Sequence, residues 1–290
     1  MEITCMFCGQ KKESSLEHVI PKAIGNNSFT TDDVCKDCNS ALGATIDSKF
    51  IDNPLIKIIR NKLKLKGYKG NVPQVLRSGE DSNGNTIILD KDYSPKYITK
   101  VVERDNNFSV LTSSKEEAAK IFKKKLERKH VPQESIDEEL KKIKNMEVEE
   151  NRPQINFCFK YDMPDLELEF LKIAFEYMNK YYGDTYKQDP VRNRLKNILN
   201  QFKSGRTANY SNYVTDNVQN QLSTPIRNAL KTYEHNVHVI LPVVNPKNKK
   251  LYIYIFLFNG CLSYRVLVSN QGDTYPEILS MSKRKMIVIS

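Results

Sequence analysis

The sequence predicts an α+β fold in which a small metal-stabilised module precedes a larger region of mixed helices and strands. Four of the six cysteines lie in two CxxC pairs near the N-terminus, within a segment rich in turn-forming residues. Beyond residue 50, segments with helical spacing of apolar residues are interspersed with strand-like segments. Hydrophobic residues make up 39% of the 290 residues, which is enough to bury a substantial core. We therefore expect two regions, residues 1–50 and residues 51–290.

The part of the chain that follows the module predicts one helix and then several strands. Between Asn53 and Lys69, apolar residues recur at near-helical spacing and predict a helix that ends before Gly67. Residues 70–112 are expected to form strands joined by turns. The sequence SNGN at 82–85 lies between two apolar runs and is typical of a hairpin.

Two charged helices and a strand are expected in the middle of the chain. The serine pair at 113–114 is followed by two glutamates, which predicts a capping box at the start of a helix over about 115–129. A second helix is expected over about 133–146. The segment QINFCFKYDM at 154–163 is predicted to form a strand.

The C-terminal half contains the clearest helical pattern and an antiparallel meander. Apolar residues repeat at helical spacing over Pro164–Tyr182, and Gly183 is positioned to end that helix. Another helix is expected to begin near Asp189–Pro190. Three apolar runs separated by NPKNK and NG then predict three consecutive antiparallel strands, NVHVILPVV, KLYIYIFLF and CLSYRVLVS.

Charge and hydropathy favour a cytoplasmic protein with a polyanionic partner. Lys and Arg total 45 against 35 Asp and Glu, a formal net charge of +10, and such a balance favours nucleic acid. The longest apolar run, Leu251–Phe258, is strand-like and falls short of the roughly 18 residues that span a bilayer. The N-terminus lacks the features of a signal peptide, so we expect no membrane association and a reducing compartment.

The four paired cysteines, Cys5, Cys8, Cys35 and Cys38, predict a structural zinc site. A CxxC pair followed by glycine folds tightly around an ion, and a second pair at the start of a helix directs two more thiolates to the same ion. Four unrelated cysteines or a redox pair are the alternative. The remaining Cys158 and Cys261 stand alone in apolar, strand-like contexts and are expected to be buried core thiols.

A second group of residues between and after the cysteine pairs combines a candidate general base with candidate ligands for a hard metal ion. Glu17 and His18 are adjacent in the sequence LEHVIP, and Asn39 follows the last paired cysteine. An imidazole with a near-neutral pKa can take a proton from water. A carboxylate and an amide oxygen can hold Mg²⁺ while leaving room for water and phosphate.

The arrangement CxxCG, LEHVIPKAIG and CxxCNSALG resembles the HNH endonuclease family, in its subgroup with a four-cysteine zinc site. The resemblance covers residues 1 to about 46 and implies a zinc-stabilised treble-clef or ββα-metal fold. His18 matches the histidine that activates water, Glu17 the acidic metal ligand, and Asn39 the last metal-binding position. The middle asparagine of the motif has no clear counterpart, and no role is assigned to Asp33, which stands nearest.

This resemblance implies an endonuclease that hydrolyses DNA with Mg²⁺ or Mn²⁺, while the zinc stays out of the chemistry. By family analogy, a stand-alone protein of this design resembles a restriction or anti-phage defence nuclease. DNA is favoured over RNA, and a homodimer or a partner protein fits double-strand cutting. The competing interpretation is a zinc-stabilised DNA-binding or interaction protein without catalysis.

The other polar clusters are less specific. Residues 51–290 contain no interpretable motif, so recognition, regulation and partner binding stay open for that region. Two basic groups are candidates for phosphate contacts or for solvated surfaces: Lys62, Lys64, Lys66 and Lys69, and Lys123, Lys124, Lys125, Arg128 and Lys129. His130, His235 and His238 lack acidic or amide companions and are expected to be structural or solvated.

Overall fold

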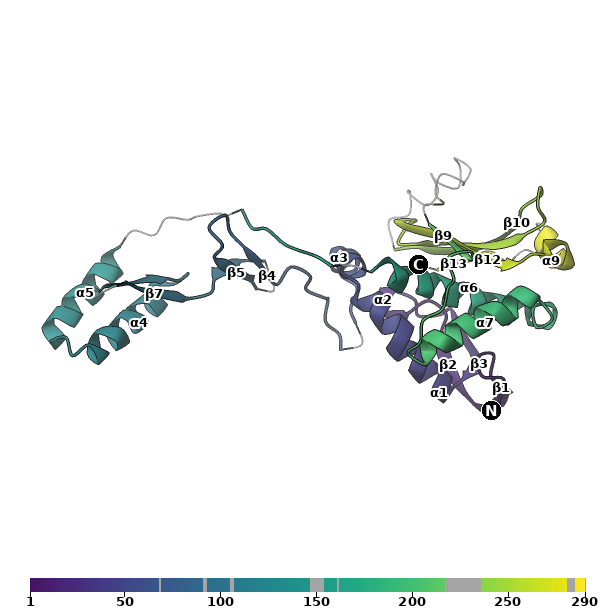
Figure 1. Ribbon diagram of the computed structural model, residues 1–290, viewed down its shortest axis with the longest axis horizontal. Coiled ribbons are helices and arrows are strands. Elements are labelled where there is room, and N and C mark those ends of the chain that lie inside the picture. Colours follow the sequence, from purple (N-terminus) through teal and green to yellow (C-terminus); the bar gives the residue numbers. More distant parts are fainter. Residues whose placement is uncertain are drawn as a thin grey trace. The chain divides into compact units, whose positions relative to one another are not determined.

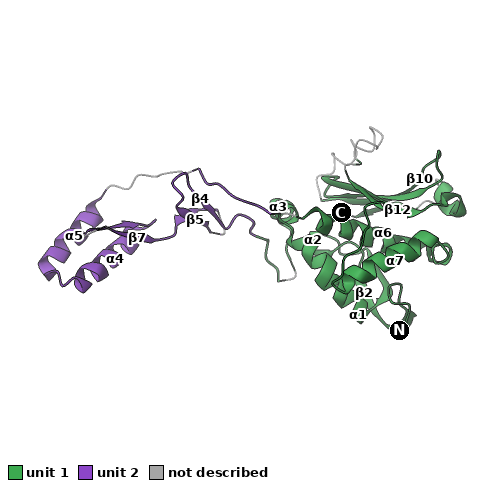
Figure 2. Cartoon of the chain, in the orientation of Figure 1, with its two compact units in different colours: residues 1–73, 161–290 green, residues 74–160 purple. Residues whose placement is uncertain are grey.

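The chain forms two compact units (Figure 2). The computed structural model describes residues 1–67, 69–90, 93–104, 107–146, 154–160, 162–216, 218, 236–280 and 285–289. Unit 1 consists of Met1–Pro73 and Tyr161–Ser290, and unit 2 consists of Gln74–Lys160. Unit 2 is therefore inserted in the sequence between the two segments that make up unit 1. The predicted α+β class is confirmed.

Unit 1 begins with an antiparallel sheet followed by a helix. Strands β1 (Glu2–Thr4), β2 (Lys11–His18) and β3 (Thr30–Cys35) pair in the order β1-β2-β3. Helix α1 (Lys36–Leu42) follows β3 directly, and the chain then runs through a π-helical turn, Gly43–Asp47, into α2 (Ser48–Asp52). This ββα element is the N-terminal module.

Helix α3 (Pro54–Lys62) confirms the helix expected after the module. The Asn53 side chain accepts a hydrogen bond from the backbone N–H of Leu55 at 3.0 Å, and Pro54 occupies the first helical position. The helix ends well before Gly67, as predicted, because Lys64 adopts a left-handed φ of 56° that a helix cannot contain.

The second segment of unit 1 contains two long helices. Helix α6 (Met163–Tyr186) extends past Gly183, so the predicted end of this helix was wrong. The backbone departs from helical geometry at Tyr182, yet one more turn follows because the buried Tyr186 ring packs against Phe175 at 6.2 Å. Helix α7 (Pro190–Lys203) begins where expected, with Asp189 accepting from the N–H of Val191.

A five-stranded sheet completes unit 1 and contains the predicted meander. Its order is β13-β10-β11-β12-β9, and every pairing is antiparallel. The strands are β9 (Val214–Asp216), β10 (His238–Val244), β11 (Leu251–Leu257), β12 (Leu262–Ser269) and β13 (Ile287–Ile289). A short helix, α9 (Pro276–Leu279), precedes the last strand.

Helices α6 and α7 form a middle layer between the ββα module and the five-stranded sheet (Figure 1). One hydrophobic core runs through all three layers. On the module side Phe7 packs on Phe175 with ring centroids 5.1 Å apart, and on the sheet side Phe170 packs on Tyr264 at 4.2 Å. The module therefore shares the hydrophobic core of unit 1. Its small size alone had suggested that a metal ion would take the place of a core.

Unit 2 combines two small antiparallel sheets with a helical hairpin. Its strands are β4 (Ser78–Glu80), β5 (Thr86–Leu89), β6 (Pro95–Tyr97), β7 (Lys100–Arg104) and β8 (Asn107–Leu111). Its helices are α4 (Lys115–Arg128) and α5 (Gln133–Asn145). The hairpin at 82–85 and the capped start of α4 are confirmed, since Ser114 Oγ accepts from the N–H of Glu117 at 3.3 Å.

Three sequence-based expectations differ from the structure or fall outside it. The strand predicted at 154–163 was wrong, because the described residues there make one isolated bridge, Asn156 with Glu80. Cys158 and Cys261 are exposed rather than buried. Cys158 lies in that irregular segment and Cys261 in the turn between β11 and β12, where neither has a sheet face to bury it. His235 lies outside the described residues.

No helix within the described part of the chain is long and apolar enough to cross a membrane.

Candidate functional site

The two CxxC pairs converge because a tight turn faces the start of a helix. The backbone N–H of Gly9 donates to Cys5 O at 2.8 Å, and Gly9 adopts a φ of +75° that favours glycine. Cys35 is the residue that precedes α1, and Cys38 lies in the first turn of that helix. The four Sγ atoms lie within 4.8 Å of one another.

This donor set fits a structural zinc ion. A tetrahedron with Zn–S bonds of 2.3 Å has sulfur atoms about 3.8 Å apart, and Cys8 Sγ lies 3.9 Å from Cys35 Sγ. Lys203 on α7 donates to Cys38 Sγ at 3.2 Å, which places a positive charge beside a site that four thiolates would make anionic. With all four positions taken by thiolates, no position is left for a reacting water.

A β-bulge shapes the end of β2, where Glu17 and His18 are located. The register with β3 shifts between Ser15 and Glu17, and a bulge re-aims the side chains that follow it. Leu16 is consequently 62% exposed, whereas the next residue, Glu17, is 3% exposed. His18 is half-buried at the last position of the strand.

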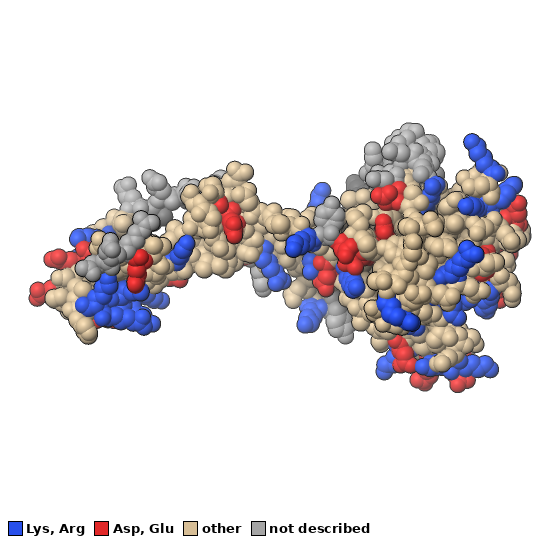
Figure 3. All heavy atoms as spheres, in the orientation of Figure 1, with Lys and Arg blue, Asp and Glu red and all other residues tan. Residues whose placement is uncertain are grey.

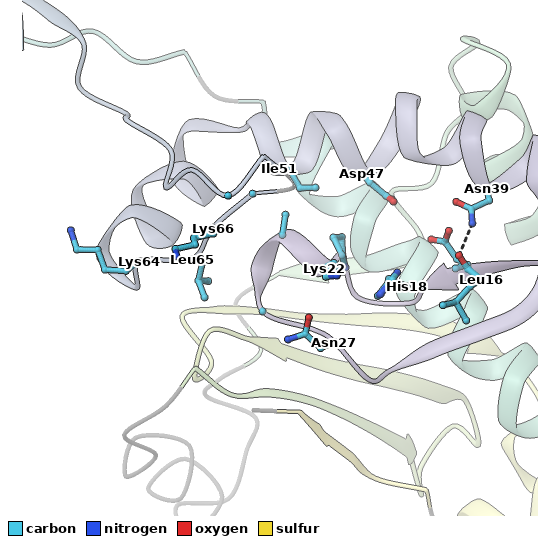
Figure 4. Close-up of a pocket in the computed structure, with 16 residues that line it drawn as sticks. Leu16, His18, Lys22, Asn27, Asn39, Asp47, Ile51, Lys64, Leu65 and Lys66 are labelled. Atoms are coloured by element: carbon cyan, nitrogen blue, oxygen red, sulfur yellow. Dashed lines mark hydrogen bonds between the residues drawn. The ribbon is translucent and has the colours of Figure 1, made fainter. Parts of the chain in front are cut away.

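Asn39 on α1 faces the end of β2. Its Nδ2 atom donates to Ser15 Oγ at 3.0 Å and to the backbone carbonyl of Leu16 at 2.9 Å. Figure 4 shows the second of these bonds. Because both amide hydrogens are used in this way, the orientation of the amide is fixed and its carbonyl oxygen stays available as an acceptor or a metal ligand.

A cavity of about 770 Å³ brings the predicted site residues together. Glu17, His18 and Asn39 all line it, and so does Asp47 from the end of the π-helical turn. Figure 4 shows Lys64 and Lys66 at the end of this cavity that lies away from Asn39. The cavity therefore joins an acidic and amide-rich end to a basic end.

Sequence reasoning missed Asp47. The residue lies eight positions after Asn39 along a continuous helical segment, and such spacing corresponds to about two turns of one face. That spacing is the signal that was available in the sequence. π-Helical turns inside helices occur frequently at functional sites, and this one brings a further carboxylate to the cavity.

Residues 5–55 match the family model described as HNH endonuclease. The N-terminal module is an HNH endonuclease domain. The match begins at the first zinc-site cysteine, includes Glu17, His18, Asn39 and Asp47, and continues into α3. It indicates a nuclease that binds nucleic acid. No curated protein and no solved structure matches the chain.

Sequence reasoning also missed Lys172, which reaches the HNH module from α6. Its Nζ atom lies 2.6 Å from Glu17 Oε1 and 2.8 Å from Asp47 Oδ1, and its side chain is fully buried. Glu176, one turn along the same helix, lies 3.9 Å away and is also fully buried. No sequence pattern connects Lys172 with Glu17, because they lie 155 positions apart in the sequence.

The surroundings of the site set the charge of its groups. Burial lowers the pKa of His18, aided by the positive charges of Lys22 and Lys172, so the imidazole is neutral at pH 7. Burial raises the pKa of Glu17, and the nearby Lys172 opposes that effect. Burial also raises the pKa of Glu169 and Glu176 well above the ordinary value of a glutamate, which favours their neutral forms.

The two basic groups differ in their surroundings. Lys64 and Lys66 line the cavity of the HNH module, together with Lys22. Lysines and arginines gather over α4 in unit 2 (Figure 3), but several have partners within that unit. Lys125 pairs with Glu103, and Lys129 lies over the Phe108 ring at 5.6 Å.

Two of the remaining histidines have structural surroundings. His130 is exposed and adopts a left-handed φ of 53° just after the end of α4. His238 is buried in β10, where its ring nitrogens contact the carbonyl of Ile24 and the N–H of Phe258. Neither residue lines the cavity that contains His18.

Proposed function

We propose that the chain is a metal-dependent HNH endonuclease that hydrolyses phosphodiester bonds in DNA. The observation that carries this proposal is the shared cavity of Glu17, His18 and Asn39 beside a closed four-cysteine cluster. A module that only binds DNA needs neither a buried acid next to a neutral imidazole nor an oriented amide oxygen.

In the proposed mechanism His18 takes a proton from a water molecule that attacks phosphorus. Its depressed pKa keeps the imidazole neutral at pH 7 and thus able to accept that proton. Glu17 and Asn39 would hold Mg²⁺ or Mn²⁺, since carboxylate and amide oxygens are the ligands that hard cations prefer. When bound, such an ion stabilises negative charge on the phosphate and on the leaving oxygen.

The basic end of the cavity suits the phosphate backbone of the substrate. Lys22, Lys64 and Lys66 are exposed side chains along the same cavity as His18. Phosphate contacts position a nucleic acid without reading its sequence. DNA is favoured over RNA by the family resemblance alone, and the net charge of +10 suits either.

A restriction or anti-phage defence nuclease is the biological role that we propose. In that role the region after residue 50 recognises DNA, senses a signal or binds a partner, while the first 50 residues carry out the chemistry. The second candidate function is a zinc-stabilised DNA-binding or interaction protein. It is favoured by the Glu17–Lys172 ion pair, which gives the acid a structural partner.

A plasmid cleavage assay with Mg²⁺ or Mn²⁺ tests the proposed function. The substrates include methylated and unmethylated phage DNA, and the parental chain is expected to cut at least one of them. The His18→Ala variant is expected to cut none, while its zinc content and melting temperature stay unchanged. His130→Ala is the matched control, because this exposed histidine lies in unit 2. Cutting by His18→Ala at the parental rate would show that His18 is not the base. A folded, zinc-loaded parent that binds DNA but cuts none supports the second candidate.

A further inference from the structure

The strongest unexplained feature of the molecule is a buried lysine at the back of the nuclease site. Lys172 is fully buried on α6 and contacts Glu17 and Asp47, the two acids that line the cavity. A buried ammonium is costly unless it is paired, so its presence here requires these carboxylates. The contact therefore links the C-terminal segment of unit 1 to the HNH module.

The geometry of the contact leaves part of each acid accessible to the cavity. Lys172 approaches Oε1 of Glu17 and Oδ1 of Asp47, one oxygen of each carboxylate. Asp47 Oδ1 is itself buried, and its 2.8 Å contact with Lys172 is an ion pair without hydrogen-bond geometry, while the side chain as a whole is 17% exposed. An ammonium held in this way fixes the rotation of both carboxylates, and both residues line the cavity.

We infer that Lys172 is a positioning residue of the nuclease site, which orients Glu17 and Asp47 so that their remaining oxygens form the acidic part of a divalent-cation site. This inference rests on the proposed function. It assigns a specific role to α6, because the HNH motif then needs one residue from outside the matched segment. Ligand orientation by neighbouring groups typically changes metal affinity 10- to 100-fold.

A comparison of variants at Lys172 and Glu176 distinguishes the positioning role from a purely structural one. It lies on the same helix, is equally buried and is 3.9 Å from Lys172, but it does not line the cavity. If the charged cluster only stabilised the fold, Lys172 and Glu176 would act in the same way. If Lys172 orients the acids, Glu176→Gln leaves the cation site intact and Lys172→Met does not.

The test measures Mn²⁺ binding to the full zinc-loaded chain by electron paramagnetic resonance, without DNA. Lys172→Met is expected to keep zinc and to bind Mn²⁺ at least about tenfold more weakly than the parent. Glu176→Gln is expected to stay within about twofold of the parent. The double variant Glu17→Gln/Lys172→Met is expected to lose less affinity than the product of the two single losses, because part of the effect of Lys172 passes through Glu17.

Three results would overturn the inference. The first is a folded Lys172→Met variant that binds Mn²⁺ as tightly as the parent. The second is a double variant whose loss of Mn²⁺ affinity equals the product of the two single losses. If Lys172→Met fails to fold, the substitution is introduced instead into the Glu17→Gln/Asp47→Asn background, where neither residue is an acid to be oriented, and a further tenfold loss there is the third. Failure of the proposed function looks different: a parent that binds Mn²⁺ in this Lys172-dependent way but cuts no DNA refutes the nuclease and leaves the positioning role intact.

Discussion

At the scale of single residues, His238 shows how burial fixes one protonation state. Its Nδ1 atom accepts a hydrogen bond from the N–H of Phe258 at 3.2 Å, and its Nε2 atom lies 3.0 Å from the carbonyl of Ile24. A proton on Nδ1 would face that N–H directly. Burial accordingly lowers the pKa of His238 from 6.5 to about 4, although the carbonyl of Ile24 opposes the shift.

We predict that His238 contributes to acid unfolding. Protonation favours the unfolded chain, so the stability that the neutral ring contributes is complete above pH 6.5 and is lost as the pH falls toward 4. The full effect is about 3 kcal/mol. Denaturant unfolding of His238→Gln between pH 7 and pH 4 is expected to show a smaller loss than the parent, with exposed His130→Gln as the control. Parallel pH curves for the parent and His238→Gln would contradict this account.

The residues of the candidate site were predictable where their signal was local. Glu17, His18 and Asn39 lie close to the paired cysteines in the sequence, and the spacing of the motif predicted them as site residues. Lys172 carries no such signal, because a lysine in an apolar helix is recognised as functional only when its buried partners are known. Cys158 was misjudged because its apolar neighbours predicted a strand that does not form.

At the scale of elements, α6 presents an unusual set of charges to the HNH module. Glu169, Lys172 and Glu176 recur at helical spacing and are all fully buried. Within the described residues, neither carboxylate oxygen of Glu176 has a hydrogen-bond partner. Lys172 lies 3.9 Å away but is closer to Glu17 and Asp47, so burial outweighs its attraction and favours a neutral Glu176.

We predict that Glu176→Gln stabilises the protein at alkaline pH. Because the pKa of Glu176 is raised in the folded state, its contribution to stability is present below its ordinary pKa near 4.5 and is lost as the pH rises through the folded value. The amide cannot ionise and avoids that loss. At pH 8 the melting temperature of Glu176→Gln is expected to exceed that of the parent by about 2–4 °C.

The comparison with acidic conditions checks the cause of this effect. At pH 5 the advantage of Glu176→Gln is expected to shrink, because a glutamate with a raised pKa is then mostly neutral. A gain that is equal at both pH values would point to better packing rather than to charge.

Most elements were predictable because their apolar residues repeat at one period. This holds for α3, α6 and α7 and for the meander β10–β12, whereas the start of α4 was predicted from its capping box. The end of α6 was not predictable in this way, because the burial of Tyr186 outweighs the helix-ending tendency of Gly183. The strands β9 and β13 are three residues each, too short for alternation to distinguish them from loops.

At the scale of the whole molecule, the arrangement of the core predicts which part of the chain is dispensable for folding. The described residues of the core cluster in unit 1 come from both of its segments, and none belongs to residues 74–160. Asp, Glu, Lys and Arg are denser in residues 74–160 than in the rest of the chain, but a charged segment alone does not show that the segments on either side of it pack together. Unit 2 therefore reads as an insertion only once the contacts of the folded chain are known.

We predict that unit 1 folds without unit 2. A chain in which residues 74–160 are replaced by a flexible Gly/Ser linker is expected to retain its zinc and a cooperative thermal transition, since no part of the unit 1 core is removed. Zinc analysis and calorimetry check this. In contrast, a chain truncated after residue 73 loses α6 and is expected to expose Phe7 and Phe50. A linker variant that binds no zinc or melts without cooperativity would show that unit 2 supports the fold.

The separation of 155 positions between Glu17 and Lys172 also has a consequence for the order of events during synthesis. At 5–20 residues per second, the ribosome adds Lys172 roughly 8–30 s after Glu17. The cysteine pairs are complete long before that moment, so a nascent chain can acquire its zinc early. Its paired acids, however, have no ammonium until α6 emerges and docks, and a chain interrupted within unit 2 carries the HNH motif without the buried counter-ion of its acids.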